Sequence, residues 1–137
     1  MERVLARSEH YAVSHEFEVV FLDRPSGPRV VIGDFYGDPI AAVIDCRERW
    51  VAAVGCGIIL YRLREPFTPY EYDKKTKQWW EALRGPEDVW WIKAVYQVED
   101  DNAVRFVVDR GDKHAGVYQL DVDPLSISRV IPRDNGA

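Results

Sequence analysis

The sequence predicts a mainly β protein, arranged as an antiparallel sandwich, a barrel or a strongly twisted sheet of about eight strands with one helix. Short apolar runs that alternate with polar residues recur along the chain, and turn-forming Gly, Pro, Asn and Asp residues separate them. Helical spacing is confined to residues 74–84. The length of 137 residues is ordinary for one domain, so we expect a single domain over 1–137 with a loose tail at 132–137.

The first half of the chain is expected to be built from strands. They are residues 16–22, 29–32, 40–44, 50–54 and 58–63. The runs 40–44 and 50–54 are apolar on both faces, which is typical of central strands that are covered on both sides. The polar stretch 45–49 joins them as a hairpin loop, and Gly55 and Gly57 allow a second tight connection.

The segment 74–84 is expected to be the one helix. Thr76, Trp79, Trp80 and Leu83 follow the i, i+3, i+4, i+7 spacing, which would place them in one apolar stripe on a helix surface. A Gly-Pro pair follows directly and would end the helix.

The strand pattern returns in the second half of the chain. The expected strands are residues 90–98, 104–108 and 118–122, with a short edge strand at 127–131. Alternation in the first of these strands places Trp90 and Tyr96 toward the core and Trp91 on the opposite face.

Composition excludes several function classes. The chain has 18 basic and 23 acidic residues, a net charge of −5, which disfavours nucleic acid as a partner. It shows neither a secretory signal pattern nor an apolar run long enough for a membrane helix, so we expect a cytoplasmic protein without a membrane partner. Cys46 and Cys56 are ten residues apart, which fits no zinc or redox spacing, and we expect two reduced, mostly buried thiols.

No motif for catalysis is present. The sequence has no phosphate-binding glycine loop, no metalloprotease helix and no nucleophile elbow. His10 and His15 would lie on opposite faces of a strand, which disfavours joint metal ligation, and His114 lies in a polar turn. We therefore expect no catalytic residues, no metal site and no cofactor.

The stretch 33–39 is the most unusual in the chain. Asp34 and Asp38 flank two aromatic residues, Phe35 and Tyr36, between two glycines. An ordinary turn explains the pattern, since Asp before Pro bonds its own following backbone. The carboxylates could instead serve as acid and base, or as ligands of a hard cation. A loop of aromatic and acidic residues also suits a protein interface.

The aromatic residues of the chain are unusually many, with five Trp, seven Tyr and five Phe. A β core closed by one helix has places for most of the tryptophans, but not for Trp91, Tyr36 and Phe35. An acidic turn at 99–101 adds negative charge that would attract a basic partner. The expected partner-binding residues are Asp34, Phe35, Tyr36, Asp38, Trp91, Glu99, Asp100 and Asp101.

Two stretches resemble small bacterial toxin-immunity proteins of the polymorphic toxin or contact-dependent inhibition type. They are GDFYGDP at 33–39 and WVAAVGCGIILY at 50–61. The resemblance implies a cytosolic immunity protein that binds one cognate toxin domain, which could be a basic one, and occludes its active site. It assigns no functional residue to a position in this chain.

Two other functions fit the same residues. One is a small-ligand-binding protein or an enzyme, with an aromatic pocket of Tyr36, Trp91 and Tyr96 and with Asp34 or His15 as a base. The other is an accessory module of a larger assembly. The sequence leaves the oligomeric state, the strand order and the identity of the partner open.

Overall fold

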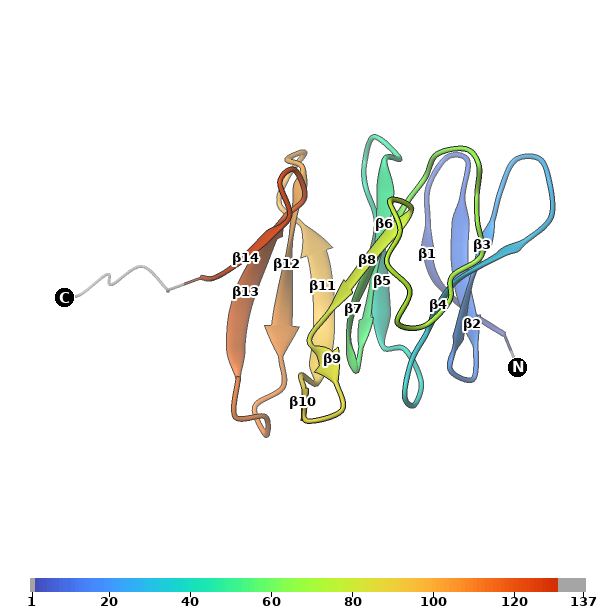
Figure 1. Ribbon diagram of the computed structural model, residues 1–137. Coiled ribbons are helices and arrows are strands. Elements are labelled where there is room, and N and C mark those ends of the chain that lie inside the picture. Colours follow the sequence, from blue (N-terminus) through green and yellow to red (C-terminus); the bar gives the residue numbers. More distant parts are fainter. Residues whose placement is uncertain (1, 131–137) are drawn as a thin grey trace.

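A computed structural model describes residues 2–130 of the chain. These residues form fourteen strands and no helix, arranged as three four-stranded antiparallel sheets and one two-stranded sheet (Figure 1). The prediction of a mainly β protein is confirmed, whereas the expected helix and the expected number of strands are wrong. The expected tail at 132–137 lies outside the described residues. Nothing in 2–130 is a helix that could cross a membrane.

Each four-stranded sheet is a meander, in which every strand pairs with the next one in the chain. The first sheet contains β1 (Arg3–Arg7), β2 (Ala12–Glu16), β3 (Val19–Asp23) and β4 (Val30–Asp34). The second contains β5 (Ala41–Ile44), β6 (Trp50–Gly55), β7 (Gly57–Arg62) and β8 (Trp79–Ala82). The third contains β11 (Ile92–Gln97), β12 (Ala103–Val108), β13 (Gly116–Asp121) and β14 (Ser126–Arg129). The short strands β9 (Arg84–Gly85) and β10 (Asp88–Val89) connect the second sheet to the third.

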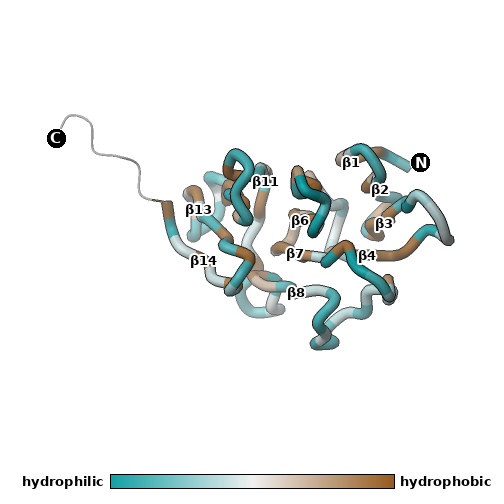
Figure 2. Tube along the Cα trace, turned by 90° about the horizontal axis from the view of Figure 1, so that it is seen from above, coloured by the Kyte–Doolittle hydropathy of each residue, from teal (hydrophilic) through white to brown (hydrophobic). Residues whose placement is uncertain are grey.

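The three sheets lie face to face in a row, in chain order (Figure 2). The first strands of the three sheets lie close together, since β5 contacts both β1 and β11. Four-stranded meanders that follow one another with the first strand innermost are the building units, or blades, of β-propellers. The second sheet is the middle layer and has both faces covered.

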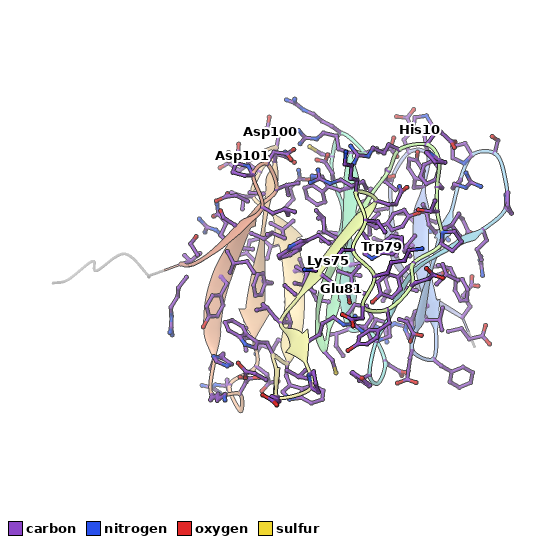
Figure 3. All side chains as sticks on the ribbon, viewed as in Figure 1. His10, Lys75, Trp79, Glu81, Asp100 and Asp101 are labelled. Carbon is purple, nitrogen blue, oxygen red and sulfur yellow. The ribbon has the colours of Figure 1, made fainter. Side chains whose placement is uncertain are left out.

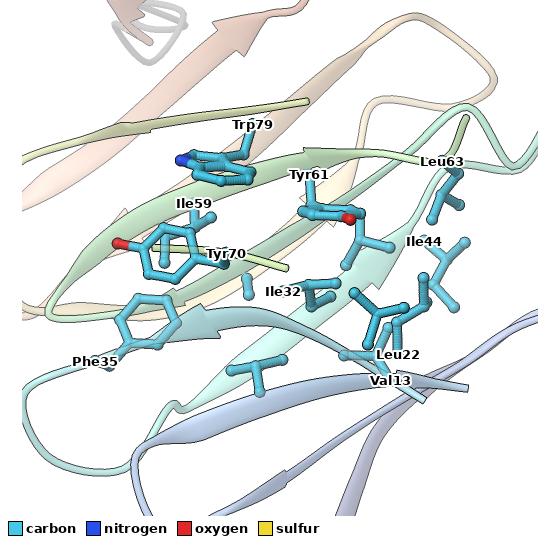
Figure 4. Close-up of a cluster of buried hydrophobic side chains, with 14 residues drawn as sticks. Val13, Leu22, Ile32, Phe35, Ile44, Ile59, Tyr61, Leu63, Tyr70 and Trp79 are labelled. Atoms are coloured by element: carbon cyan, nitrogen blue, oxygen red, sulfur yellow. The ribbon is translucent and has the colours of Figure 1, made fainter. Parts of the chain in front are cut away.

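The middle sheet separates two hydrophobic cores. The first core joins the first and second sheets and contains Val13, Leu22, Ile32, Ile59, Tyr61 and Trp79 among others (Figure 4). The second core joins the second and third sheets and contains Trp50, Leu60, Ile92, Phe106 and Leu120 among others. Every residue of β6 is buried. This burial confirms the interpretation of 50–54 as a central strand, which has to be apolar on both faces.

The segment expected to be a helix pairs instead with the free edge of β7. Tyr61 lies opposite Trp79, and Leu60 lies opposite Trp80, in an antiparallel register. A pair of adjacent aromatic residues fits a two-residue period as well as a helical one, because a strand places the two rings on opposite faces. The helix prediction failed since both faces of this sheet are apolar, so the strand buries the Trp79 ring on one face and packs the half-buried Trp80 ring on the other.

A β-bulge reverses the expected orientation of Tyr96. The register of β11 against β12 shifts between Ile92 and Ala94. Ile92 is buried before the bulge, but after it Val95 packs against the second core and Tyr96 is exposed. One extra residue therefore moved Tyr96 from the predicted core face to the solvent face.

Two other local predictions also differ from the structure. Residues 16–22 are not one strand, because Phe17 has a φ of 52° and lies in the turn between β2 and β3. Of the two cysteines, Cys56 is buried but Cys46 is exposed in the turn between β5 and β6. The two thiols lie at opposite ends of β6, and both are free.

Candidate functional site

Four exposed aromatic residues belong to, or lie beside, the turns and loops at one end of the three sheets. This is the lower end in Figure 1. The β2–β3 turn, the β4–β5 loop, the β6–β7 connection, the start of β11 and the β12–β13 turn all lie at this end. The exposed rings are Phe17 (73 %), Tyr36 (54 %), Tyr72 (50 %) and Trp91 (56 %). We call the surface formed by these four residues the aromatic end.

The β4–β5 loop is held from both sides. The Phe35 amide donates to the Glu18 carbonyl at 2.9 Å, and the Gly37 amide donates to the Glu18 carboxylate at 2.5 Å. From the second sheet, the Cys56 thiol donates to the Tyr36 carbonyl at 2.6 Å. These bonds direct the Phe35 ring into the first core, where it is 3 % exposed, and leave Tyr36 outside. Phe35 is therefore a core residue and does not belong to the accessible surface for which it was predicted.

Trp91 lies directly before β11, and its backbone is fixed by the turn between β12 and β13. Its amide donates to the Asp112 carboxylate at 2.9 Å, and its carbonyl accepts from the Asp109 amide at 2.8 Å. It also forms a single antiparallel bridge with Cys56 of the second sheet. The preceding Trp90 is half-buried and stacks on His114 at 4.1 Å. The backbone therefore orients Trp90 toward the protein and leaves the Trp91 ring at the surface.

Tyr36 and Trp91 line one pocket of about 360 Å³, which we call the Tyr36–Trp91 pocket. The β4–β5 loop, the β6–β7 connection and β11 all contribute to it, so it lies where the second and third sheets meet. Its buried lining consists of Gly55, Cys56 and Ile92. A Cβ on Gly55 would lie 3.3 Å from the Pro39 Cα, so glycine at this position allows the loop to approach β6 closely.

Two aspartates and one lysine complete the pocket lining with Ile40 and Gly37. Asp38 and Lys93 take part in no ion pair among residues 2–130. Asp109 accepts a hydrogen bond from the Gly111 amide at 2.9 Å. The pocket therefore combines apolar walls with charged groups, two negative and one positive.

A buried arginine supports the part of the aromatic end around Tyr72. The Arg84 side chain donates to the Asp34 carbonyl at 2.6 Å, and its guanidinium carbon lies 5.0 Å from the Phe35 ring and 5.4 Å from the Tyr72 ring. Its Nε is 3.2 Å from a Glu81 carboxylate oxygen. A smaller pocket of about 120 Å³ lies here, lined by Asp34, Phe35, Tyr36, Tyr72 and Arg84.

Burial is the main cause of the pKa shifts of two groups at these pockets, Asp34 and Cys56. Burial raises the pKa of Asp34 above its usual value, Glu18 raises it further, and Arg84 opposes both. Burial likewise raises the pKa of the Cys56 thiol, which disfavours the reactive thiolate form. Neither group has the lowered pKa of an activated nucleophile.

The predicted partner-binding residues do not form one surface. Tyr36, Asp38 and Trp91 share the Tyr36–Trp91 pocket, and Asp34 borders the smaller pocket beside it. The acidic turn lies at the other end of the sheets, where Figure 3 labels Asp100 and Asp101. Glu99, Asp100 and Asp101 therefore cannot act together with the β4–β5 loop at one contact.

The residues suggested for an enzyme are brought together only in part: Tyr36 and Trp91 share one pocket and Asp34 borders the smaller one, but Tyr96 and His15 line neither. His15 is buried in β2, where its Nδ1 is 2.9 Å from the Phe17 carbonyl oxygen. At the opposite end, Ser8 and His10 each bond to the carboxylate of Glu48. In a catalytic triad the serine would instead bond directly to its histidine base. No group of three or more His, Cys, Asp or Glu side chains within 2–130 could hold a metal ion.

Two residues that shape this region, Arg84 and Tyr72, are not indicated by any pattern in the sequence. Arg84 belonged to the expected helix, and its neighbours Asp34 and Phe35 are about fifty positions away in the chain. Only the pairing of β8 with β7 brings it beneath the β4–β5 loop. Tyr72 lies in the irregular segment before β8, where no periodicity indicates which side chains are exposed.

The fold and this end together define a three-sheet antiparallel β protein with an aromatic surface at the turns. We compared the chain with models of protein families, with curated proteins and with solved structures, and none of them matches it.

Proposed function

We propose that this protein is a binding protein that holds a protein partner at the aromatic end. The observation that carries the proposal is the grouping of four large rings, each at least half exposed, at one end of the sheets. Exposed apolar residues are ordinary when they are scattered, but a group of them marks an interaction surface. Trp and Tyr are the residues that contribute most to binding at the centres of protein interfaces.

The charge around the aromatic end supports a basic partner. Glu18, Asp34 and Asp38 are exposed around the β2–β3 turn and the β4–β5 loop, whereas the exposed basic residues of this end, Lys93, Arg110 and Lys113, belong to the third sheet and its β12–β13 turn. The whole chain has a net charge of −5. A negative surface accelerates association with a positive one and discriminates against acidic proteins.

In its narrower form, the proposal is that the partner is a toxin domain and that binding occludes its active site in the cytoplasm. The support for this form is the resemblance of residues 33–39 and 50–61 to toxin-immunity proteins. The first stretch includes the loop that carries Tyr36, and the second includes Cys56, so both contribute to the Tyr36–Trp91 pocket.

The test begins with capture of partners from the source cell and continues with the purified complex. We expect Tyr36→Ala combined with Trp91→Ala to weaken binding at least about tenfold, as expected for two aromatic residues that contribute strongly to binding. The matched control is Tyr96→Ala, which removes an exposed ring from the outer face of the third sheet and should leave the affinity unchanged. Equal affinity of wild type and double variant would overturn the proposal.

Charge reversal tests the direction of the charge argument. Asp38→Lys should slow association with the partner, and the effect should shrink as salt concentration rises. Asp100→Lys at the opposite end is the control with the same change in net charge. For the toxin form, co-expression of the partner with wild type should restore growth of the host, and co-expression with the double variant should not.

A small-ligand-binding protein is the second candidate function. Its support is the Tyr36–Trp91 pocket, whose volume of about 360 Å³ falls in the range of small-molecule sites. Thermal unfolding of wild type and Trp91→Ala against a metabolite collection separates the two candidates. A compound that raises the unfolding temperature of the wild type but not that of Trp91→Ala, at a concentration near its dissociation constant, would favour the small-ligand-binding function.

A further inference from the structure

We propose that the Tyr36–Trp91 pocket is the anchor site for one cationic side chain, an arginine or a lysine, of the protein partner. The inference rests on the proposed function and deepens it, since it names the chemistry that fills the pocket. It requires a pocket with room for a long side chain, apolar walls for an aliphatic stem, rings for a cation and unpaired negative charge.

The walls of the pocket suit the stem and the head of such a side chain. Ile92 and Cys56 are buried beneath it and present apolar surface to methylene groups. Tyr36 lies in the β4–β5 loop and Trp91 directly before β11, and both line the space. A guanidinium or ammonium group placed over an indole or phenol ring is attracted by the negative face of the ring, and Trp is the best partner for it.

The charges at the pocket select a cation over an anion. Asp38 has no ion pair among residues 2–130, and the Asp109 carboxylate accepts its hydrogen bond from a backbone amide. Lys93 is the one opposing charge in the lining, which leaves the lining with one more negative than positive group. An acidic side chain could pair only with Lys93 and would meet two aspartates, whereas a basic one could pair with either aspartate and would meet one lysine.

The pocket is also formed before a ligand arrives. The Trp91 backbone is bonded to Asp109 and Asp112, and the β4–β5 loop is bonded to Glu18 and Cys56. A site whose backbone is already fixed loses little entropy when it binds, so more of the interaction energy appears as affinity.

The test uses short capped peptides that differ at one position. The probes are acetyl-Gly-Arg-Gly-amide, the same peptide with citrulline, which keeps the shape of arginine without its charge, and the same peptide with glutamate. Binding is followed by NMR through the indole signal of Trp91, assigned by its loss in Trp91→Phe. We expect the arginine peptide to bind about fivefold more tightly than the citrulline peptide, and the glutamate peptide to cause no shift.

Variants of the charged lining residues make the test sharper. Asp38→Asn should weaken binding of the arginine peptide about threefold, and Lys93→Met should strengthen it by a similar factor, because the first removes an attraction and the second a repulsion. Asp100→Asn at the opposite end should change nothing. Equal shifts from the arginine and citrulline peptides, or no response of the Trp91 signal to either, would overturn the inference.

The purified partner separates failure of this inference from failure of the proposed function. Replacing its basic interface residues one at a time by glutamine should identify one side chain whose loss removes the effect of Asp38→Asn. If binding needs Tyr36 and Trp91 but depends on no single basic residue, the cationic anchor is wrong and the aromatic end remains the interface. If the partner binds the Tyr36→Ala, Trp91→Ala double variant as tightly as the wild type, the proposed function itself fails.

Discussion

The indole rings of Trp79 and Trp80, neighbours in the chain, lie in two different hydrophobic cores on opposite faces of the second sheet. Trp79 stacks on Tyr61 in the first core with ring centroids 6.3 Å apart, and its Nε1 donates to the Lys74 carbonyl at 3.1 Å. Trp80 lies opposite Leu60 and packs against the second core. One short edge strand therefore contributes to both cores.

Replacing each tryptophan separately should give unequal losses of stability. Trp79 is 4 % exposed, so Trp79→Ala should lower the free energy of unfolding by about 3–5 kcal/mol. Trp80 is only half-buried, and Trp80→Ala should cost about half as much. Urea unfolding followed by circular dichroism measures both. A helix at 74–84, with the two rings on one stripe, would instead make the two losses similar.

The same tryptophans show where sequence patterns stop being decisive. Period-two alternation and turn residues were enough to predict β6, β12 and β13 within a residue or two, because each of these strands buries large apolar side chains at alternate positions of at least one face. The Trp79–Trp80 pair fits both periods, so pairing with β7 decided its structure. The bulge in β11 inserts a single residue, and no turn residue in the sequence indicates where it occurs.

The candidate site could be predicted only in part, for a similar reason. The 33–39 stretch and Trp91 stood out by composition, and the structure brings Tyr36, Asp38 and Trp91 to one pocket. The acidic turn at 99–101 had the right charge, but the direction of β11 carries it to the other end of the sheets. Composition identifies residues that are unusual, whereas the direction of each strand decides which of them meet.

Gly57 should tolerate no side chain. Its φ is +88°, and an added Cβ would lie 2.5 Å from the Arg84 Cβ and 2.8 Å from the Ala82 carbonyl oxygen. Gly57→Ala should therefore lower stability by at least about 3 kcal/mol, from backbone strain together with the displacement of β8 and β9. Gly37→Ala is the control, since its φ is +79° with no atom within 4 Å, and it should cost only about 1 kcal/mol. Thermal unfolding measures the loss of stability in both variants. Equal losses in Gly57→Ala and Gly37→Ala would refute the steric argument.

The two cysteines should differ sharply in reactivity. Cys46 is exposed, whereas Cys56 is 3 % exposed, donates to the Tyr36 carbonyl and has a pKa raised by burial. A thiol reagent should therefore modify one cysteine quickly in the native protein and the second only as the protein unfolds. Cys46→Ser should abolish the fast phase, and Cys56→Ser should leave it intact. Fast modification of Cys56 in the Cys46→Ser variant would show that the Tyr36–Trp91 pocket opens readily.

The fully buried carboxylate of Asp45 links the second and third sheets. It accepts hydrogen bonds from the Arg49 side chain and backbone, and from Gln97 Nε2 of β11 at 2.7 Å. Burial alone would raise its pKa, but the hydrogen bonds from Arg49 and Gln97 outweigh burial and hold the pKa below the usual 3.8. The native protein therefore favours the ionised form of Asp45 more than the unfolded chain does.

The sign of the pH dependence follows from this lowered pKa. The stabilisation from Asp45 is complete above about pH 4, the region of the unfolded-state pKa, and is lost as the pH falls through the lower native pKa. Asp45→Asn should reduce the free energy of unfolding at pH 7 by about 2 kcal/mol, and its stability should fall less steeply below pH 4 than that of the wild type. Urea unfolding from pH 7 down to about pH 2.5 measures both slopes. Asp100→Asn, an exposed carboxylate changed in the same way, should keep the wild-type slope, and a variant Asp45→Asn with that same slope would show that the carboxylate is not preferentially ionised in the native state.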